Sequence, residues 1–109
     1  MTYKVKTITV FEKQAKRLIK KYVSLKKELA ELIDELRKNP EHGTPIGKNC
    51  FKIRISIASK GKGKSGGARI ITNFVITDAT VYLISIYDKS EKQNLTDKEL
   101  GELLKYIPE

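Results

Sequence analysis

The sequence predicts a single α+β domain, residues 1–109, in which an antiparallel sheet carries helices on one face. Two amphipathic helical segments lie near the N-terminus, three strand-like segments follow, and one short capped helical segment comes last. The predicted order of elements is therefore β-α-α-β-β-β-α. A chain of 109 residues has the length of one domain with one modest core.

The N-terminal third is predicted to form one strand and a helical hairpin. Residues 3–10 are typical of a short strand, and a helix begins near Phe11. Ser24 is a candidate N-cap for a second helix, which ends before Asn39-Pro40. Because the break between the helices is short, we expect them to pack as a hairpin. Apolar residues recur at helical spacing at Phe11, Ala15, Leu18 and Tyr22, and again at Leu25, Leu29, Leu32, Ile33 and Leu36.

Three strands and a final helix are predicted for the rest of the chain. Between residues 51 and 57 apolar side chains alternate strictly with others, which predicts a strand with one buried face. Residues 68–77 and 80–87 are expected to form two further strands, joined as a hairpin. Thr96 and Glu99 have the spacing of a capping box for a helix over 97–106.

The positive charge of the chain is concentrated in one segment. The formal net charge is +9 and the isoelectric point is near 9.7. Residues 42–77 contain no Asp or Glu, whereas the remainder of the chain holds 15 basic and 13 acidic residues. Such a surplus favours an anionic partner such as nucleic acid, an anionic membrane surface or an acidic protein, although a charged run also serves solubility alone. The seven cations of the segment are Lys48, Lys52, Arg54, Lys60, Lys62, Lys64 and Arg69.

Targeting signals and membrane segments are not recognised in the sequence. There is no apolar run of the length that spans a bilayer, and residues 1–10 lack the apolar stretch of a secretory signal. We therefore expect a cytoplasmic protein without a membrane partner. Cys50 is the only cysteine, so the chain forms no internal disulfide and no cysteine-based zinc site.

Three groups of residues are candidates for chemistry on RNA. Lys52 and Arg54 lie two residues apart and must share the face opposite the apolar one. The Gly/Lys run over 59–67 lacks the spacing of a Walker motif, which argues against nucleotide hydrolysis. The run is therefore either a flexible loop that binds phosphate groups or a surface loop without a binding function. Tyr87, at the end of the last strand, is either a stacking or proton-transfer group or an aromatic packed on the final helix. The remaining candidates are Arg69, Lys89, Lys92 and Asn94.

The residues that are missing narrow the mechanism. His42 is the only histidine, so a two-histidine ribonuclease mechanism is not available within one chain. The basic segment has no carboxylates with which to hold a metal, and we expect neither a metal nor a cofactor. RNA cleavage remains feasible, because the 2′-hydroxyl attacks its own phosphate and Lys and Arg stabilise the charge that develops. A lysine with a lowered pKa could then act as the base.

Three segments resemble the RelE/ParE superfamily of type II toxins, and most closely its RelE/HigB-like branch. They are Cys50-Phe51-Lys52-Ile53-Arg54, the run from Ser59 to Arg69 that ends in Gly66-Gly67-Ala68-Arg69, and Ile86-Tyr87-Asp88-Lys89-Ser90-Glu91-Lys92. The resemblance covers nearly the whole chain and implies a RelE-like fold. It also implies a toxin of a toxin–antitoxin system that enters the ribosomal A site, cleaves translated mRNA and arrests growth. A cognate antitoxin would neutralise it, and an assembly formed through that antitoxin is left open.

The resemblance also implies roles for individual residues. Lys52 and Arg54 match the family's paired basic strand residues. Arg69 matches the family's arginine that contacts the scissile phosphate. Lys89 matches a basic residue that is proposed in the family to protonate the leaving group. Leu95 stands where well-studied members have a tyrosine, so Tyr87 or a lysine would replace that base, or the chemistry would be weak. Lys48, Lys60, Lys62, Lys64 and Lys92 are added as RNA contacts. A gyrase inhibitor of the ParE type that cleaves no RNA, and a basic nucleic-acid-binding module without catalysis, remain alternatives.

Overall fold

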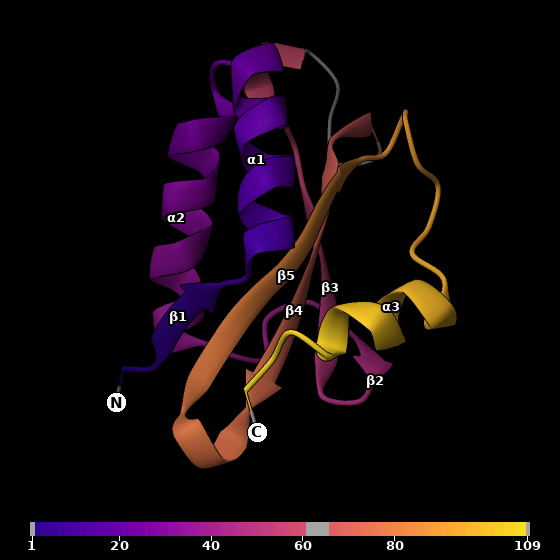
Figure 1. Cartoon of the computed structure of the whole chain (residues 1–109). Coiled ribbons are helices and arrows are strands. Elements are labelled where there is room, and N and C mark those ends of the chain that lie inside the picture. The colour runs from indigo at the N-terminus through magenta and orange to yellow at the C-terminus, as the bar shows by residue number, and fades with distance from the viewer. Residues whose placement is uncertain (1, 61–65, 109) are drawn as a thin grey trace.

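The computed structural model describes residues 2–60 and 66–108 and has three helices and a five-stranded sheet (Figure 1). No helix in these two ranges is both long and apolar enough to cross a membrane. The elements are β1 Lys4–Thr7, α1 Thr9–Lys21, α2 Leu25–Lys38, β2 Thr44–Gly47, β3 Cys50–Ile55, η1 Ala58–Lys60, β4 Ala68–Val75, η3 Ile76–Asp78, β5 Thr80–Asp88 and α3 Asp97–Leu104.

The sheet has the order β1-β5-β4-β3-β2. The α+β class, the N-terminal helical hairpin and the succession of strands before a last helix are confirmed. Two details differ from the prediction, since β1 pairs in parallel with β5 and β2 adds a strand beside β3. The four residues of β2 include Pro45 and Gly47, which are tolerated because the strand lies at the edge of the sheet. A strand of this composition gives no alternating pattern in the sequence.

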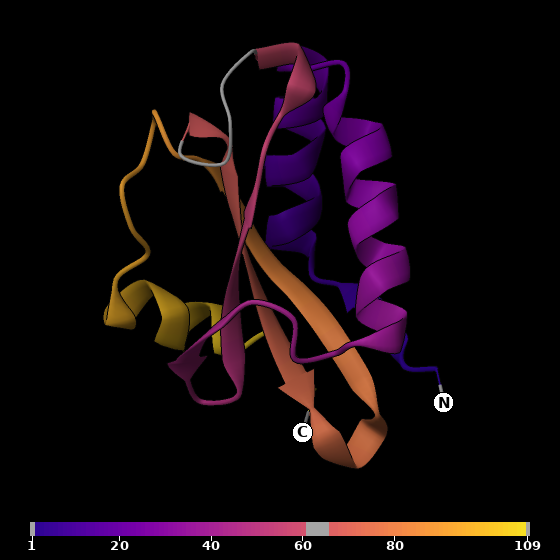
Figure 2. The ribbon, with the colours of Figure 1, turned by 180° about the vertical axis from the view of Figure 1, so that it is seen from behind.

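The helices cover both faces of the sheet, so the prediction that all of them pack on one face is wrong. Helices α1 and α2 lie on one side, and α3 lies on the other, in both views of the ribbon (Figures 1 and 2). The cause is β5, whose nine residues are all buried. A strand that is apolar on both faces needs cover on both sides, and α3 supplies part of the second cover.

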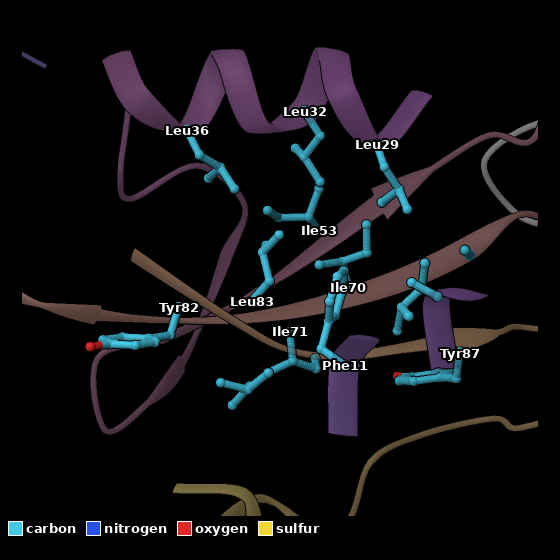
Figure 3. Packing of buried hydrophobic residues seen from close by; sticks show 14 of the residues in the cluster. Phe11, Leu29, Leu32, Leu36, Ile53, Ile70, Ile71, Tyr82, Leu83 and Tyr87 are labelled. Atoms are coloured by element: carbon cyan, nitrogen blue, oxygen red, sulfur yellow. The ribbon is translucent and has the colours of Figure 1, made fainter. Parts of the chain in front are cut away.

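The core lies between the helical hairpin and the sheet (Figure 3). Leu32 and Leu36 of α2 point toward Ile53 and Leu83, whereas Ile71 lies on the far side of the sheet. Strand parity explains this division, because successive residues of a strand face opposite sides. Helix α1 contributes Phe11, Ala15 and Leu18, and α2 contributes Leu25, Leu29, Leu32 and Leu36.

Candidate functional site

Three candidate residues form a row across the three central strands, near one end of the sheet. Arg54 of β3 lies opposite Arg69 of β4, and Arg69 lies opposite Tyr87 of β5. Directly paired residues share one face, with Cβ atoms about 4.5–5.5 Å apart. Lys52 is two residues from Arg54 and therefore shares this face, which we call the cationic face. The register thus brings together four side chains that are up to 35 positions apart in the sequence.

Arg69 occupies the centre of the row and is only 4% exposed. One of its guanidinium nitrogens, Nη1, donates to the carbonyl oxygen of Ala68 at 3.2 Å. Its strand is flanked on both sides by hydrogen-bonded neighbours, which fixes the backbone that carries it. A guanidinium that is held in this way needs little reorganisation when negative charge develops beside it.

Tyr87 is buried beside Arg69, and its hydroxyl makes no hydrogen bond to any described residue. Burial raises the pKa of the phenol above its ordinary value, and the positive charges of Arg69 and Lys92, with the nearby backbone N–H of Leu95, offset only part of that effect. Tyr87 therefore keeps its proton at neutral pH and has an unused donor. It also lines a cavity of about 300 Å³ with Leu103 and Tyr106, close to α3. Both interpretations of Tyr87, a chemical group and an aromatic against the last helix, are compatible with this position.

Lys52 connects β3 to the segment that follows β5. Its Nζ donates to Oδ1 of Asn94 at 3.2 Å, across the cationic face. The end of β5 does not itself reach β3, because β4 lies between them. Residues 89–96 make the approach instead, through Asn94, and Arg54 on the same face of β3 as Lys52 is exposed.

Lys89 is placed by a close backbone approach at the corner where β4 begins and β5 ends. Its backbone N–H donates to the carbonyl oxygen of Gly67 at 3.0 Å, and its Nζ donates to that of Gln93 at 3.2 Å. Gly67 has no room for a side chain, since a Cβ there would lie 2.0 Å from the carbonyl oxygen of Ile55. Glycine at position 67 therefore allows the start of β4 to lie against the end of β3, and its carbonyl oxygen holds the backbone of Lys89 at the same end of the sheet.

Lys60, expected to contact RNA, forms a buried ion pair with Asp88 instead. The Lys60 side chain is 9% exposed and the Asp88 side chain 0%. The Asp88 carboxylate also accepts hydrogen bonds from the Tyr22 hydroxyl at 2.7 Å and from the backbone and hydroxyl of Ser90 at 2.9 and 2.7 Å. Burial alone would raise the pKa of Asp88, but the hydrogen bonds from Lys60, Tyr22 and Ser90 hold it well below its usual range. The amine of Lys60 is thus withdrawn from the cationic face.

The other predicted RNA contacts are dispersed. Lys92 donates to Glu99 of α3, and this bond, with that from Thr96, lowers the pKa of Glu99 to about 2. Lys48 is exposed in the turn between β2 and β3, at the opposite end of β3 from Arg54. Lys62 and Lys64 lie outside the described residues.

Sequence reasoning missed the groups that support the site. Asp88 follows a run of apolar residues at the end of a strand, and an acid in such a position signals a buried partner. Glu91 was also missed as the acceptor for Arg17 at 2.7 Å and Lys21 at 3.2 Å, which ties α1 to the segment after β5. Within residues 2–60 and 66–108, no three His, Cys, Asp or Glu side chains gather as a metal site would require. The chemistry that the arrangement offers is stabilisation of anionic charge by Arg and Lys.

Comparison with known proteins identifies the family and the fold. A family model described as the RelE toxin of the RelE/RelB toxin–antitoxin system matches residues 4–107. A mutant of the Escherichia coli toxin RelE in the free state superimposes with a TM-score of 0.61 at 18% identity, covering 99% of this chain and 100% of that chain. The E. coli RelBE toxin–antitoxin complex gives 0.61 at 17% identity, covering 79% and 95%. The Mycobacterium tuberculosis RelBE2 complex gives 0.61 at 16% identity, covering 81% and 92%. Because the family model spans almost the whole sequence, this chain belongs to the RelE toxin family.

Proposed function

We propose that this protein is a ribosome-dependent endoribonuclease, an mRNA interferase that cleaves translated mRNA in the ribosomal A site without a metal ion. The observation that carries the proposal is the row of Arg54, Arg69 and Tyr87 on one face of the sheet. Two guanidinium groups and one undissociated phenol in a row give a phosphate group donors on adjacent strands.

The proposed reaction is an in-line attack by the ribose 2′-hydroxyl on the adjacent phosphorus. A bond forms between O2′ and phosphorus while the bond to the 5′-oxygen breaks, which leaves a 2′,3′-cyclic phosphate and a 5′-hydroxyl. Negative charge accumulates on the non-bridging oxygens, where Arg69 and Arg54 would stabilise it. Arg69 has the central role in this proposal because it is buried, and a cation in a site that excludes water interacts more strongly with the anion.

Proton transfers complete the proposed reaction. The raised pKa of Tyr87 suits a hydrogen-bond donor to the phosphate rather than a base, because the phenol stays protonated at neutral pH. A water molecule accepts the proton of the attacking 2′-hydroxyl, and Lys89, whose backbone is held beside Gly67, is the group we assign to protonation of the leaving 5′-oxygen. Lys52, held near Asn94, would contact the neighbouring phosphate of the mRNA.

The proposed partners are mRNA on the ribosome and a cognate antitoxin. Two of the similar structures, from E. coli and M. tuberculosis, are toxin–antitoxin complexes. A net charge of +9 favours an acidic antitoxin, which would cover the cationic face and block access of RNA. We place this pair in the bacterial cytoplasm, where ribosomes and mRNA are found.

The test is inducible expression in bacteria, with mRNA 5′ ends mapped by primer extension. We expect new ends within translated codons for the wild type, and a decrease of about 10²–10³-fold in cleavage for Arg69→Ala. Arg69→Lys keeps the charge but loses the planar fork, and should also cleave poorly. Arg37→Ala, which removes an exposed arginine from α2, is the matched control and should cleave like the wild type.

Three other results of this experiment would change the proposal. Growth arrest with intact transcripts and signs of DNA damage would replace the proposal with gyrase inhibition. Normal growth with steeply salt-dependent binding to any nucleic acid would leave a binding module without catalysis. Full cleavage by a folded Arg69→Ala variant would remove Arg69 from the mechanism.

A further inference from the structure

The outer face of α1 carries a line of lysines that the cleavage site does not use. Lys13, Lys16 and Lys20 are exposed, and they point away from the core face of the helix formed by Phe11 and Leu18. Their spacing of three and four residues aligns them along about 10 Å of one helix face. None of the three makes a hydrogen bond or an ion pair with a described residue. We call these three residues the α1 basic ridge.

Two further cations flank the ridge and share one acid. Arg17 and Lys21 both contact Glu91, which is the only carboxylate that they contact in the described part of the chain. A shallow surface hollow here is lined by Lys13, Lys16, Arg17, Lys20 and Lys21 alone. The five positive charges of these 13 helical residues outnumber the two nearby acids, Glu12 of the same helix and Glu91, so the local field stays positive.

The composition of the ridge distinguishes between partners. A protein partner needs apolar or aromatic anchors at the centre of its interface, where lysine is depleted, and the lining of this hollow has neither. Single-stranded RNA is bound largely by stacking of bases on aromatic rings, and Tyr22, at the end of α1, is bonded to Asp88 instead. A line of lysines on one helix face suits the regular phosphate backbone of a duplex, whose shape is recognised without contact to the bases.

We propose that the α1 basic ridge binds the phosphate backbone of double-helical ribosomal RNA and so attaches the toxin to the ribosome. This inference rests on the proposed function, since it takes the ribosome as the partner. The ridge and the cationic face are on opposite sides of the sheet, as the positions of α1 and α3 show (Figures 1 and 2). One surface therefore holds ribosomal RNA while the other acts on mRNA.

The experiment measures binding of the full chain to 70S ribosomes that carry no mRNA, at several salt concentrations. The test variant replaces Lys13, Lys16 and Lys20 with Gln. A matched control replaces three other exposed lysines with Gln, so both variants lose three positive charges; they are Lys4, Lys26 and Lys98. Circular dichroism verifies that both variants remain folded.

We expect the ridge variant to bind more weakly and to show a shallower dependence of log K on log salt concentration. Each phosphate contact contributes a slope of about −0.7 to −0.9, so the slope should become shallower by about two to three. The control should keep the wild-type slope. Equal losses in both variants would mean that net charge alone binds the ribosome, and an unchanged ridge variant would mean that α1 binds nothing there; either result overturns the inference.

Two additional measurements separate this inference from the proposed function. With a ribosome excess that saturates binding, the ridge variant should cleave mRNA at the wild-type rate, whereas Arg69→Ala should not. If the wild-type protein binds ribosomes through the ridge but never cleaves mRNA, the proposed ribonuclease activity is refuted and the inference about the ridge stands. If the ridge variant no longer binds the antitoxin but binds ribosomes with wild-type affinity, the ridge is a binding site for a protein partner and the inference is overturned.

Discussion

Lys60 offers a direct test of how the corner of the site is held together, because its amine is almost wholly withdrawn from solvent. Replacing Lys60 with Met keeps most of the apolar stem and removes the charge that faces Asp88. The Asp88 carboxylate then stays buried with hydrogen bonds from Tyr22 and Ser90 only. We expect a large loss of stability from this single change.

The expected magnitude follows from the environment of the pair. Removing one partner of a buried ion pair costs about 3–5 kcal/mol, because the other charge is left uncompensated. Asp88 keeps three hydrogen bonds, so the lower limit of about 3 kcal/mol applies. With a urea m value of about 2 kcal/mol/M, the unfolding midpoint should fall by about 1.5 M. The double variant of Lys60→Met with Asp88→Asn should lose less than the sum of the singles, with a coupling of about 2 kcal/mol.

The dependence on pH gives a second measurement of the same pair. The pKa of Asp88 is lower in the folded than in the unfolded chain, where it is about 3.9. Its stabilising contribution is therefore complete above that pH and is lost as the pH falls toward the folded pKa. The stabilities of the wild type and of Lys60→Met should differ most at neutral pH and should begin to converge below about pH 4, because the variant lacks the main partner that lowers this pKa.

The control for this experiment is the exposed pair of Arg37 and Asp34 on α2. Arg37→Met should change the free energy of unfolding by about 0.5 kcal/mol or less, as exposed pairs do. The reasoning is refuted if Lys60→Met also costs less than about 1 kcal/mol, or if its deficit is the same at pH 3 as at pH 7. Either result would mean that Lys60 reaches solvent and that Asp88 is held by its other bonds.

Three further substitutions test the cationic face and its surroundings. Tyr87→Phe should raise the free energy of unfolding by about 1 kcal/mol, since it removes a buried hydroxyl without a partner, and should lower mRNA cleavage; full cleavage would exclude the hydroxyl from the mechanism. Thr72→Val removes a second such hydroxyl and should stabilise by about 1 kcal/mol in urea unfolding with cleavage unchanged, and a loss of stability would contradict this. Thr96→Ala removes the N-cap of α3 and should cost about 1 kcal/mol, with faster amide exchange in α3, so unchanged exchange would count against the cap.

The elements that sequence analysis predicted well are those specified by local patterns. The capping box at Thr96 set the start of α3 at Asp97, where the structure has it. The alternation after Cys50 predicted that Lys52 and Arg54 share a face, and the register agrees. Strand β2 gave no such pattern, and the parallel pairing of β1 with β5 joins segments more than 70 residues apart. Local periodicity carries no information about such a contact.

The sequence predicted which residues belong to the candidate site better than it predicted how those residues are arranged. Whether Arg54 meets Arg69 depends on the register between β3 and β4, and a slip of one residue would send one of them to the other face. Lys60 shows a second limit, because the Gly/Lys run looks uniform in sequence while only a contact to Asp88, 28 residues away, separates this lysine from the rest. A lysine that forms an ion pair with a residue far away in the sequence is not available to bind RNA. The sequence alone does not reveal such ion pairs.

The distribution of charged residues along the sequence also does not predict the α1 basic ridge. Outside residues 42–77 the basic and acidic residues nearly balance, which places the surplus in the middle of the sequence. In the structure seven of the 13 acids lie on α2 and α3, whereas Lys13, Lys16 and Lys20 line the outer face of α1. Charges that cancel in a sum do not cancel in space once they are separated by about a Debye length, near 8 Å at physiological salt. If both proposals hold, two cationic surfaces on opposite sides of one sheet would separate attachment from cleavage, and variants should exist that lose either one alone.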